Sequence, residues 1–327
     1  MALRPVAVIG LGGMGGGMAH ALVAAGFPVT VYNRTREKAL PLVEAGATLA
    51  ESAGDAASAA SVILLSLADE AAVEKVLFGE VAGRLAEGST VIDASTVAPD
   101  YARNAAQRLA ELGVARVEGC VVGNPQMARL GKLRVFASGD EAAVAAVADV
   151  LDAVGQEVRY LGSWGRASSL KLAFNLILGV QTAGLAEALA FAESAGLDRD
   201  MVLDALDGSG WKSPVLSFRA DFMRRRSYTP AGFRTELMRK DLRLVQEAAA
   251  QRGFGLPVVD ETARRYDAVI AAGRGDDDAA AVVDTAVVDL ATTDRVAADL
   301  GAVEAAAAGL DVGGKKERAA VAQEVTG

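Results

Sequence analysis

A lysine in an apolar stretch is the side chain with the clearest capacity for chemistry in this sequence of 327 residues. Lys171 and Asn175 are four residues apart, so a helix places them on one face. Desolvation among apolar neighbours lowers the pKa of a lysine and lets it transfer a proton near neutral pH. A lysine near a helix end also commonly lays its stem over apolar surface and keeps its charge in water. The residues alone leave both interpretations of Lys171 open.

A glycine-rich turn near the N-terminus is the second feature with chemical potential. An apolar run at residues 6–9 is too short for a helix and leads into a Gly-x-Gly-x-x-Gly motif. A segment with helical spacing of apolar residues and a β-rich run at residues 29–34 follow. Strand, glycine turn, helix and strand in this order are the fingerprint of a dinucleotide-binding unit. The turn residues that we expect to bind the cofactor are Gly10, Leu11, Gly12, Gly13, Met14 and Gly15.

Three of these glycines have separate physical roles in such a unit. Gly10 permits the tight turn, Gly12 lets a pyrophosphate approach the backbone, and Gly15 lets the helix lie close to the strand. The unpaired N–H groups and the dipole at the start of the helix then attract the diphosphate. The motif therefore predicts a site for a dinucleotide.

The end of the second strand indicates which dinucleotide binds. Enzymes that prefer NAD usually carry Asp or Glu there, whereas this chain has Asn33, Arg34 and Thr35. No carboxylate repels a 2′-phosphate, and Arg34 can pair with one, so we expect NADPH to be preferred over NADH. The alternative is that Arg34 is a solvated arginine at a helix start. Thr35 can cap that helix, in which Pro41 predicts a kink or a late start.

Short apolar runs alternate with helical spacers after this unit and predict an α/β fold with a mostly parallel, doubly wound sheet. The expected strands cover residues 61–66, 91–93, 116–121, 133–136 and 158–161. Ligands bind such sheets at the C-terminal ends of the strands, so Leu67 and Ser95 are further candidates for cofactor contact. Ser95 and Thr96 also stand where a side chain can cap a helix that begins at Pro99.

The pattern changes near residue 162 from strands to helices. We expect a Rossmann-type dinucleotide-binding domain at residues 1–162 and an all-helical domain at residues 163–290, which opens with a long inter-domain helix at residues 163–193. Further helices are expected at residues 200–206, 233–251, 257–272 and 276–290. Residues 291–327, rich in Ala, Val and Asp and broken by Gly and Lys, predict a loosely ordered tail.

The composition excludes several classes of partner and site. A net charge of −9 argues against nucleic acid or an anionic membrane as the main partner. The longest later uncharged run, residues 172–186, is too short to span a bilayer. A single cysteine rules out an intrachain disulfide and a metal–cysteine cluster, which fits a reducing cytoplasm, and we expect no metal site. A small molecule is the expected partner.

Four motifs in this order resemble the β-hydroxyacid dehydrogenase family, over roughly residues 6–283. That family includes 3-hydroxyisobutyrate dehydrogenases and the reductases of tartronate semialdehyde, glyoxylate and succinic semialdehyde. The motifs are the glycine turn with Asn33-Arg34, the segment Asp93–Pro99, the helix with Lys171 and Asn175, and the run Arg239-Lys240-Asp241-Leu242.

The resemblance implies a role for each motif. Thr96 would contact the nicotinamide end of the cofactor, and Lys240 would close on the cofactor from the helical domain. Lys171 would be the general acid and base, and Asn175 would orient the substrate beside it. A hydride would pass to a carbonyl carbon while Lys171 protonates the oxygen, without a metal. The family also implies a homodimer or a higher homo-oligomer.

The substrate loop departs from the family pattern. The family usually reads Asp-Ala-Pro-Val-Ser-Gly-Gly, whose last three residues hold a carboxylate, whereas this chain ends the loop with Val122, Gly123 and Asn124. The Val122 side chain has no donor for a hydrogen bond to a carboxylate, so we expect a less polar substrate or one bound through Asn124. The loop also resembles the imine reductases, which often read Asp-Gly-Ala-Ile-Met-Ala-Thr-Pro. Lys171 favours carbonyl or alcohol chemistry, while the loop keeps imine reduction open.

The remaining candidates carry weaker signals. Trp211 and Phe233 lie where the helical domain should cover the site, and they fit an apolar pocket wall or ordinary core packing equally well. His20 is expected to be structural, and Cys120 to be a small core residue. Three functions are therefore weighed. They are an NADP-dependent dehydrogenase or reductase of small β-hydroxy acids or their semialdehydes, an NADPH-dependent imine reductase, and a non-catalytic NADP-binding scaffold, against which Lys171 and Asn175 argue.

Overall fold

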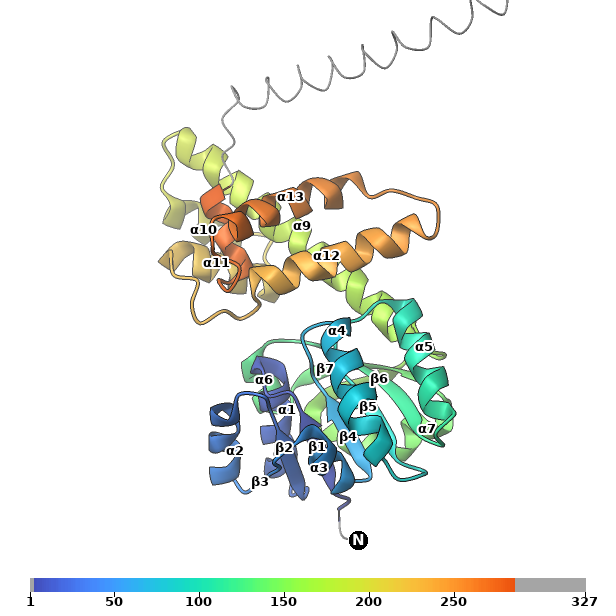
Figure 1. Cartoon of the computed structure of the whole chain (residues 1–327). Coiled ribbons are helices and arrows are strands. Elements are labelled where there is room, and N and C mark those ends of the chain that lie inside the picture. The colour runs from blue at the N-terminus through green and yellow to red at the C-terminus, as the bar shows by residue number, and fades with distance from the viewer. Residues whose placement is uncertain (1–2, 286–327) are drawn as a thin grey trace, which may run out of the picture. The chain divides into compact units, whose positions relative to one another are not determined.

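The computed structural model describes residues 3–285, and the contacts of residues 1–283 group them in one compact unit (Figure 1). An eight-stranded sheet precedes a set of helices. The strands are β1 (Val6–Ile9), β2 (Val29–Tyr32), β3 (Thr48–Leu49), β4 (Val62–Leu65), β5 (Thr90–Asp93), β6 (Ala115–Val122), β7 (Leu133–Gly139) and β8 (Gly155–Tyr160).

The helices between the strands are α1 (Gly13–Ala24), η1 (Arg36–Ala39), α2 (Leu40–Glu44), α3 (Ala53–Ser58), α4 (Glu70–Val73), η2 (Glu74–Val81), η3 (Ala82–Arg84), α5 (Pro99–Ala110), α6 (Pro125–Arg129), α7 (Glu141–Ala146) and α8 (Ala148–Val154). Those after the sheet are α9 (Arg166–Ser194), α10 (Arg199–Asp207), α11 (Pro214–Arg225), α12 (Thr235–Ala250), α13 (Pro257–Ala271) and η4 (Ala279–Thr285).

The strand order β3-β2-β1-β4-β5-β6-β7-β8 is that of a doubly wound sheet. In this spatial order, all neighbouring strands from β3 through β2, β1, β4 and β5 to β6 pair in parallel. Strand β7 pairs antiparallel with β6, and β8 runs parallel to β7. The mostly parallel sheet is thus confirmed, and β7 is the point where the direction reverses. The chain leaves β1 toward β2 on one side and returns to β4 on the other, so a ligand crevice is expected at the carboxyl end of β1.

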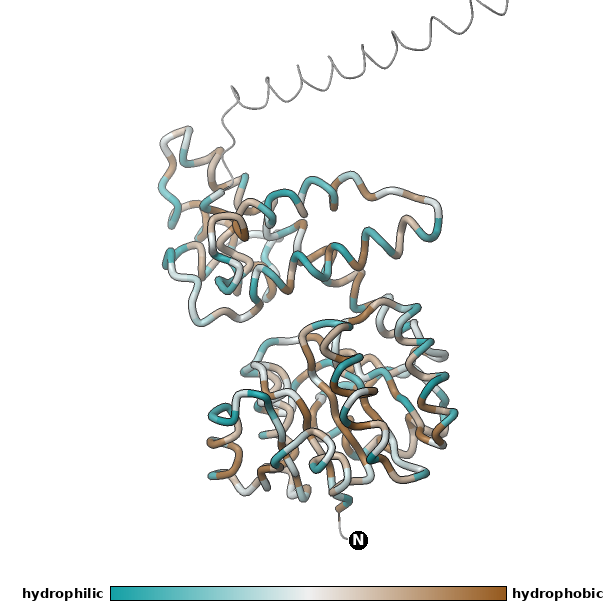
Figure 2. The backbone as a smooth tube through the Cα atoms, in the orientation of Figure 1, coloured by the Kyte–Doolittle hydropathy of each residue, from teal (hydrophilic) through white to brown (hydrophobic). Residues whose placement is uncertain are grey.

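The two faces of the sheet carry separate hydrophobic cores, as the alternation along β4 demonstrates. Val62 and Leu64 pack with α1, α6 and α8, whereas Ile63 and Leu65 pack with α3, η2 and α5. Strand β4 is buried on both faces and is apolar throughout. Hydrophobic stretches run through the sheet in Figure 2.

Helix α9 connects the sheet with the later helices. It contacts β6 and β7 near its start and α12 and α13 along its length (Figure 1). By length and composition alone this helix could also cross a membrane. Its polar groups bond inside the protein, however: Asn175 reaches Asp241, and the Gly179 carbonyl accepts from Tyr266. These contacts are those of a core helix of a folded protein.

Several expectations about elements are corrected by the structure. Strand β3 was not expected, because two residues give no periodicity. Helix α11 was also missed, although Ser213 caps it and Pro214 opens it. Residues 276–290 were expected to be helical, but a 3-10 helix covers only Ala279–Thr285 of the described part. The expected end of the helical domain at residue 290 and the tail at residues 291–327 lie outside the described residues.

The change from strands to helices falls where it was expected, because strand β8 ends at Tyr160 and α9 begins at Arg166. The division into two domains at residue 162 stays a prediction, since the contacts group residues 1–283 in one unit. Pro41 lies in the first turn of α2, so the α-helix starts late, after a 3-10 turn, as one of the two expected outcomes.

Gly15 is the residue through which α1 lies on β1, and this gives a stability test. A Cβ at Gly15 would meet the Gly10 carbonyl oxygen at 2.0 Å, whereas the nearest atom to a Cβ at Gly16 is 3.6 Å away. We therefore expect Gly15→Ala to lower the free energy of unfolding by about 1–3 kcal/mol in urea denaturation. Gly16→Ala, which gains the same helix propensity without the clash, should be neutral or stabilising. Equal effects of the two substitutions would contradict this account of Gly15.

Candidate active site

The glycine turn forms an open cradle at the carboxyl end of β1. Gly10 has φ +94°, which favours glycine, and Gly12 precedes α1 without any side-chain cap. No atom lies within 4 Å of the position that a Cβ on Gly12 would take. The first N–H groups of α1 are thus exposed to a ligand, in the arrangement that a diphosphate requires. Gly13, Met14 and Gly15 form the first turn of the helix, as the fingerprint predicts.

Asn33 connects the end of β2 to this turn. Its Oδ1 accepts from the Leu11 N–H at 2.9 Å, and its Nδ2 donates to the Thr35 carbonyl at 2.9 Å. Arg34 is exposed and makes no ion pair with another described residue, in contrast to Arg36, which pairs with Glu51 at 3.1 Å. The Thr35 side chain makes no cap bond, so its expected capping role is wrong. Asn33 holds the turn, and Arg34 is available to a ligand.

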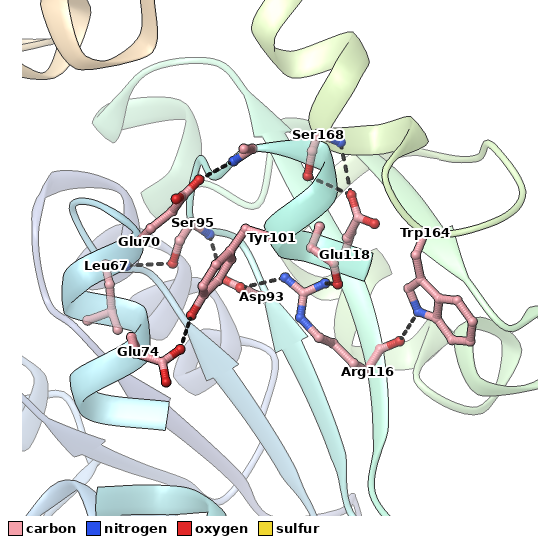
Figure 3. Close-up of polar contacts among 12 residues, drawn as sticks. Leu67, Glu70, Glu74, Asp93, Ser95, Tyr101, Arg116, Glu118, Trp164 and Ser168 are labelled. Carbon is pink, nitrogen blue, oxygen red and sulfur yellow. Dashed lines mark hydrogen bonds and ion pairs between the residues drawn. The ribbon is translucent and has the colours of Figure 1, made fainter. Parts of the chain in front are cut away.

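The ends of β4 and β5 are joined by side-chain bonds (Figure 3). Ser95 Oγ accepts from the Leu67 N–H at 2.9 Å, and the Ser95 N–H donates to Asp93 Oδ1 at 2.9 Å. Asp93 Oδ2 in turn accepts from the guanidinium of Arg116 at 2.7 Å, and both side chains are buried. Ala98 is the cap residue of α5, so neither Ser95 nor Thr96 caps that helix. Ser95 instead fixes the loop that carries Thr96.

Strand β6 holds the start of α9 through a buried carboxylate (Figure 3). Glu118 accepts from the Gly165 N–H, from the Ser168 N–H at 3.0 Å and from the Ser168 hydroxyl at 2.7 Å. The Trp164 indole N–H donates to the Arg116 carbonyl at 2.9 Å. A negative charge at a helix N-terminus is stabilising. Glu118 was missed as a site residue, although a carboxylate inside an apolar strand was a visible signal.

Lys171 lies one turn along α9 from these contacts. Its Nζ donates to the Val121 carbonyl oxygen at 3.0 Å, near the carboxyl end of β6. Burial lowers the pKa of Lys171, while the nearby Asp241 opposes that shift. The half-buried side chain thus turns its amine to strand β6, where a backbone carbonyl accepts from it.

Asn175, Asp241 and Lys240 form a polar chain between α9 and α12. The Asn175 Nδ2 donates to Asp241 Oδ2, and Lys240 Nζ lies 2.7 Å from Asp241 Oδ1. Lys240 Nζ also donates to the Thr96 carbonyl at 2.8 Å, so α12 reaches the loop after β5. The Asp241 carboxylate, 1% exposed, therefore fixes both neighbours. Asp241 belongs to the last of the four sequence motifs, but its hydrogen bond with Asn175 was not predicted.

The substrate loop approaches both α9 and the glycine turn. Val122 and Leu170 both pack against a small apolar cluster of Cys120, Phe136 and Ala167. Asn124 Oδ1 accepts from the Met127 N–H at 2.9 Å and caps α6, which leaves only its Nδ2 group for a ligand. Gly123, which lies between Val122 and Asn124, has φ +150°. A Cβ on Gly13 would lie 3.0 Å from Pro125 of this loop, so the loop and the glycine turn are in contact.

The weaker candidates occupy different environments. Trp211 is 81% exposed, so ordinary core packing is wrong for it. Phe233 is half-buried, and its N–H donates to the buried Asp278 at 3.0 Å. His20 lies half-buried in α1. Burial raises the pKa of the Cys120 thiol to about 12, so it remains protonated at neutral pH, as expected of a core residue.

The arrangement brings an amine of lowered pKa to the edge of the sheet where β1, β4, β5 and β6 end. The cradle at Gly12 and the uncapped start of α1 fit the diphosphate of a dinucleotide. The amine can give a proton to, or take one from, an oxygen or nitrogen atom beside that dinucleotide.

Comparison with known proteins gives two family matches. Residues 5–162 match the NAD-binding domain of 6-phosphogluconate dehydrogenase, and residues 165–286 match the NAD-binding domain of NADP-dependent 3-hydroxyisobutyrate dehydrogenase. Glyoxylate/succinic semialdehyde reductase 1 of Arabidopsis thaliana is 32% identical over 85% of this chain and 97% of its own length.

Solved structures agree with these matches. A 3-hydroxyisobutyrate dehydrogenase from Salmonella typhimurium is 30% identical and superposes with a TM-score of 0.82 over 86% of this chain and 99% of its own. An imine reductase from Pseudomonas sp. shares the fold, with a TM-score of 0.56 at 24% identity over 86% of this chain and 99% of its own.

The contribution of Asp241 to the titration of Lys171 can be measured directly. Removing that negative charge in Asp241→Asn should lower the pKa of Lys171 further. Acetylation of Lys171 by acetic anhydride, followed across pH by peptide mass spectrometry, should therefore show its midpoint at lower pH. Asp267→Asn, at an exposed partner of Arg239, is the control and should leave the midpoint unchanged. A midpoint that stays or rises in Asp241→Asn would refute the coupling.

Proposed function

Because the chain belongs to the β-hydroxyacid dehydrogenase family of NAD(P)-dependent oxidoreductases that act on CH–OH groups, we propose that Lys171 is its general acid and base. The proposed reaction exchanges a hydride between NADP and a small β-hydroxy acid or its aldehyde or semialdehyde. The observation that carries this proposal is the Lys171 amine, held on the Val121 carbonyl at the sheet edge with a lowered pKa. The similarity to a reductase of glyoxylate and succinic semialdehyde supports the substrate class.

Different residues of this chain bind the cofactor, transfer the proton and orient the substrate in the proposed reaction. The glycine turn, Arg34, Leu67, the Ser95–Thr96 loop and Lys240 would hold the cofactor, which supplies or accepts the hydride when it is bound. Lys171 protonates the carbonyl oxygen in reduction and stabilises the negative charge that develops there. In oxidation its neutral amine removes the hydroxyl proton. Asn175, fixed by Asp241, orients the substrate beside Lys171.

The preference for NADP is part of the proposal. Arg34 is exposed and unpaired among the described residues, and no carboxylate follows β2 to repel a 2′-phosphate. The match of the C-terminal half to the NADP-dependent 3-hydroxyisobutyrate dehydrogenase model supports the same choice.

Imine reduction is the second candidate function. The loop with Val122 and Asn124 and the fold shared with an imine reductase favour it, whereas the proton donor Lys171 suits a carbonyl oxygen. A non-catalytic scaffold would leave the lowered pKa of Lys171 without a role.

A homodimer or larger assembly is also proposed. Large apolar side chains lie exposed on α9 and before α11 in the single chain, where a second copy would cover them. They are Ile177, Phe191 and Trp211, with 48%, 77% and 81% of their surface exposed.

Replacing Lys171 tests the proposed mechanism. Lys171→Met keeps an apolar side chain of similar length and removes the proton donor, so kcat should fall by about 10²- to 10⁴-fold. Affinity for NADPH, measured by fluorescence titration, should change little. Lys75→Met, on the exposed surface of η2, is the control and should keep full activity. Unchanged turnover in Lys171→Met would remove this lysine from the mechanism, and a preference of the wild type for cyclic imines over aldehydes would select the second function.

Replacing Arg34 tests the cofactor preference. Arg34→Ala should raise the Kd for NADPH by about 10- to 100-fold and leave the Kd for NADH nearly unchanged, because only NADPH carries the 2′-phosphate. Arg36→Ala removes an arginine that already pairs with Glu51 and should affect neither. An equal rise of the Kd for NADPH and for NADH in Arg34→Ala would contradict the role of Arg34 in cofactor preference.

A further inference from the structure

A small pocket lies between the first helices of the chain, close to the cofactor cradle. It has a volume of about 160 Å³ and is lined by residues of α1, η1, α2 and α6, which are Gly16, His20, Lys38, Pro41, Leu42 and Arg129. None of these residues belongs to the proposed cofactor or substrate site. We propose that this pocket binds a phosphate group, free or carried by a small ester, in addition to the dinucleotide.

The charge of the lining is the first support. Lys38 and Arg129 contribute two positive charges from different elements, and no carboxylate lines the pocket among the described residues. Neither side chain forms an ion pair or a side-chain hydrogen bond with another residue in the described range 3–285. By contrast, Arg36, on the same short helix as Lys38, is paired with Glu51 at 3.1 Å. Two cations that share a pocket without a counter-ion repel each other, so an anion between them is favourable.

His20, the single histidine of the chain, adds a third nitrogen group. The residue lines the pocket, and its Nδ1 is buried and has no hydrogen-bond partner among the described residues. Most buried polar atoms in proteins have such a partner. Because no protein group fixes the proton on Nδ1, the other ring nitrogen, Nε2, can carry it and donate to an anion.

Gly16 leaves space for a ligand in this pocket. A Cβ at Gly16 would have only backbone atoms of Leu11 within 4 Å, the nearer of them at 3.6 Å, so no side chain of α2 or α6 covers the glycine. Helices α2 and α6 both contact α1, and the three lie together in Figure 1. A pocket of this volume has room for several water molecules or for one phosphate group.

The pocket is separate from the residues that we assign to the cofactor. Gly16 follows Gly12 of the cradle by four residues, and Lys38 follows Arg34 by four. Arg129 is the last residue of α6, which contributes nothing to the proposed cofactor site. A dinucleotide on the glycine turn and Arg34 therefore leaves the charge of Arg129 without a partner.

The donors favour a phosphate over a carboxylate. The guanidinium fork of Arg129 matches two phosphate oxygens, and Lys38 acts as a point charge. A phosphate monoester carries about −1.5 to −2 charges at pH 7 and balances both cations, whereas a carboxylate balances one. Because the side chains of Lys38 and Arg129 are exposed, the rest of an ester can extend into water.

Calorimetric titration of inorganic phosphate into the wild-type protein saturated with NADP tests the proposal. NADP fills the glycine turn, so the heat that remains comes from another site. We expect one phosphate per chain, and acetate at equal ionic strength should bind at least about tenfold more weakly. Phosphate that binds only in the absence of NADP would make the pocket part of the cofactor site and would overturn the proposal, as would equal affinity for acetate.

A parallel titration with glycerol 3-phosphate distinguishes the two sources of the phosphate group. Binding of both compounds supports a site for an ester, and binding of inorganic phosphate alone supports a site for the free ion. Binding of neither would overturn the proposal. A protein that binds no NADP would contradict the proposed function, while the substitutions below would still locate the phosphate.

Substitutions connect the binding to the pocket. Arg129→Gln and Lys38→Gln each remove one charge from the lining and should raise the Kd for phosphate by about tenfold or more. Lys132→Gln removes an exposed charge three residues after Arg129 and outside the lining, so it is the control and should leave the Kd within about twofold. An unchanged Kd in Arg129→Gln, or an equal rise in Lys132→Gln, would overturn this location of the site.

Discussion

The geometry of the site depends on one buried carboxylate, that of Glu118. It accepts hydrogen bonds from Gly165 and Ser168 at the start of α9, and strand β6 fixes its own position. Because a helix is rigid, fixing its first turn also fixes Lys171 and Asn175 farther along it. Without the Glu118 carboxylate, the donors of Gly165 and Ser168 would be buried without a partner. Any other position of α9 has the same cost, so the contact specifies one position of the helix more strongly than it adds stability.

A second buried pair extends this constraint across the sheet. Asp93 at the end of β5 bonds the guanidinium of Arg116 on β6, and Asp93 also orients Ser95. The loop that carries Thr96 and the strand that supports Lys171 are therefore held by one polar network inside an apolar core (Figure 3). Both charges of the network are buried and paired, and only the Nε of Arg116 has no hydrogen-bond partner among the described residues.

Much of the fold and part of the site could be predicted from the sequence, because local patterns determine them. The glycine turn, the apolar strands and the uninterrupted run of α9 each follow from chain geometry within a few residues. Long-range features could not be predicted in this way. The reversed direction of β7 and the bond from Asn175 to Asp241 each depend on residues that pack together only in the folded chain. Helix α11 was missed although its start carries local signals, a Ser213 cap and Pro214 in the first turn.

The contact between α1 and α6 has a consequence for the evolution of specificity. Gly13 abuts Pro125, and a Cβ on Gly17 would come within 2.6 Å of Ala128, so the helix under the cofactor cradle and the helix after the substrate loop share one seam without free volume. A side chain added at Gly13 or Gly17 would therefore displace α6 and the substrate loop that precedes it. At these two positions the cofactor cradle and the substrate loop cannot change independently of each other.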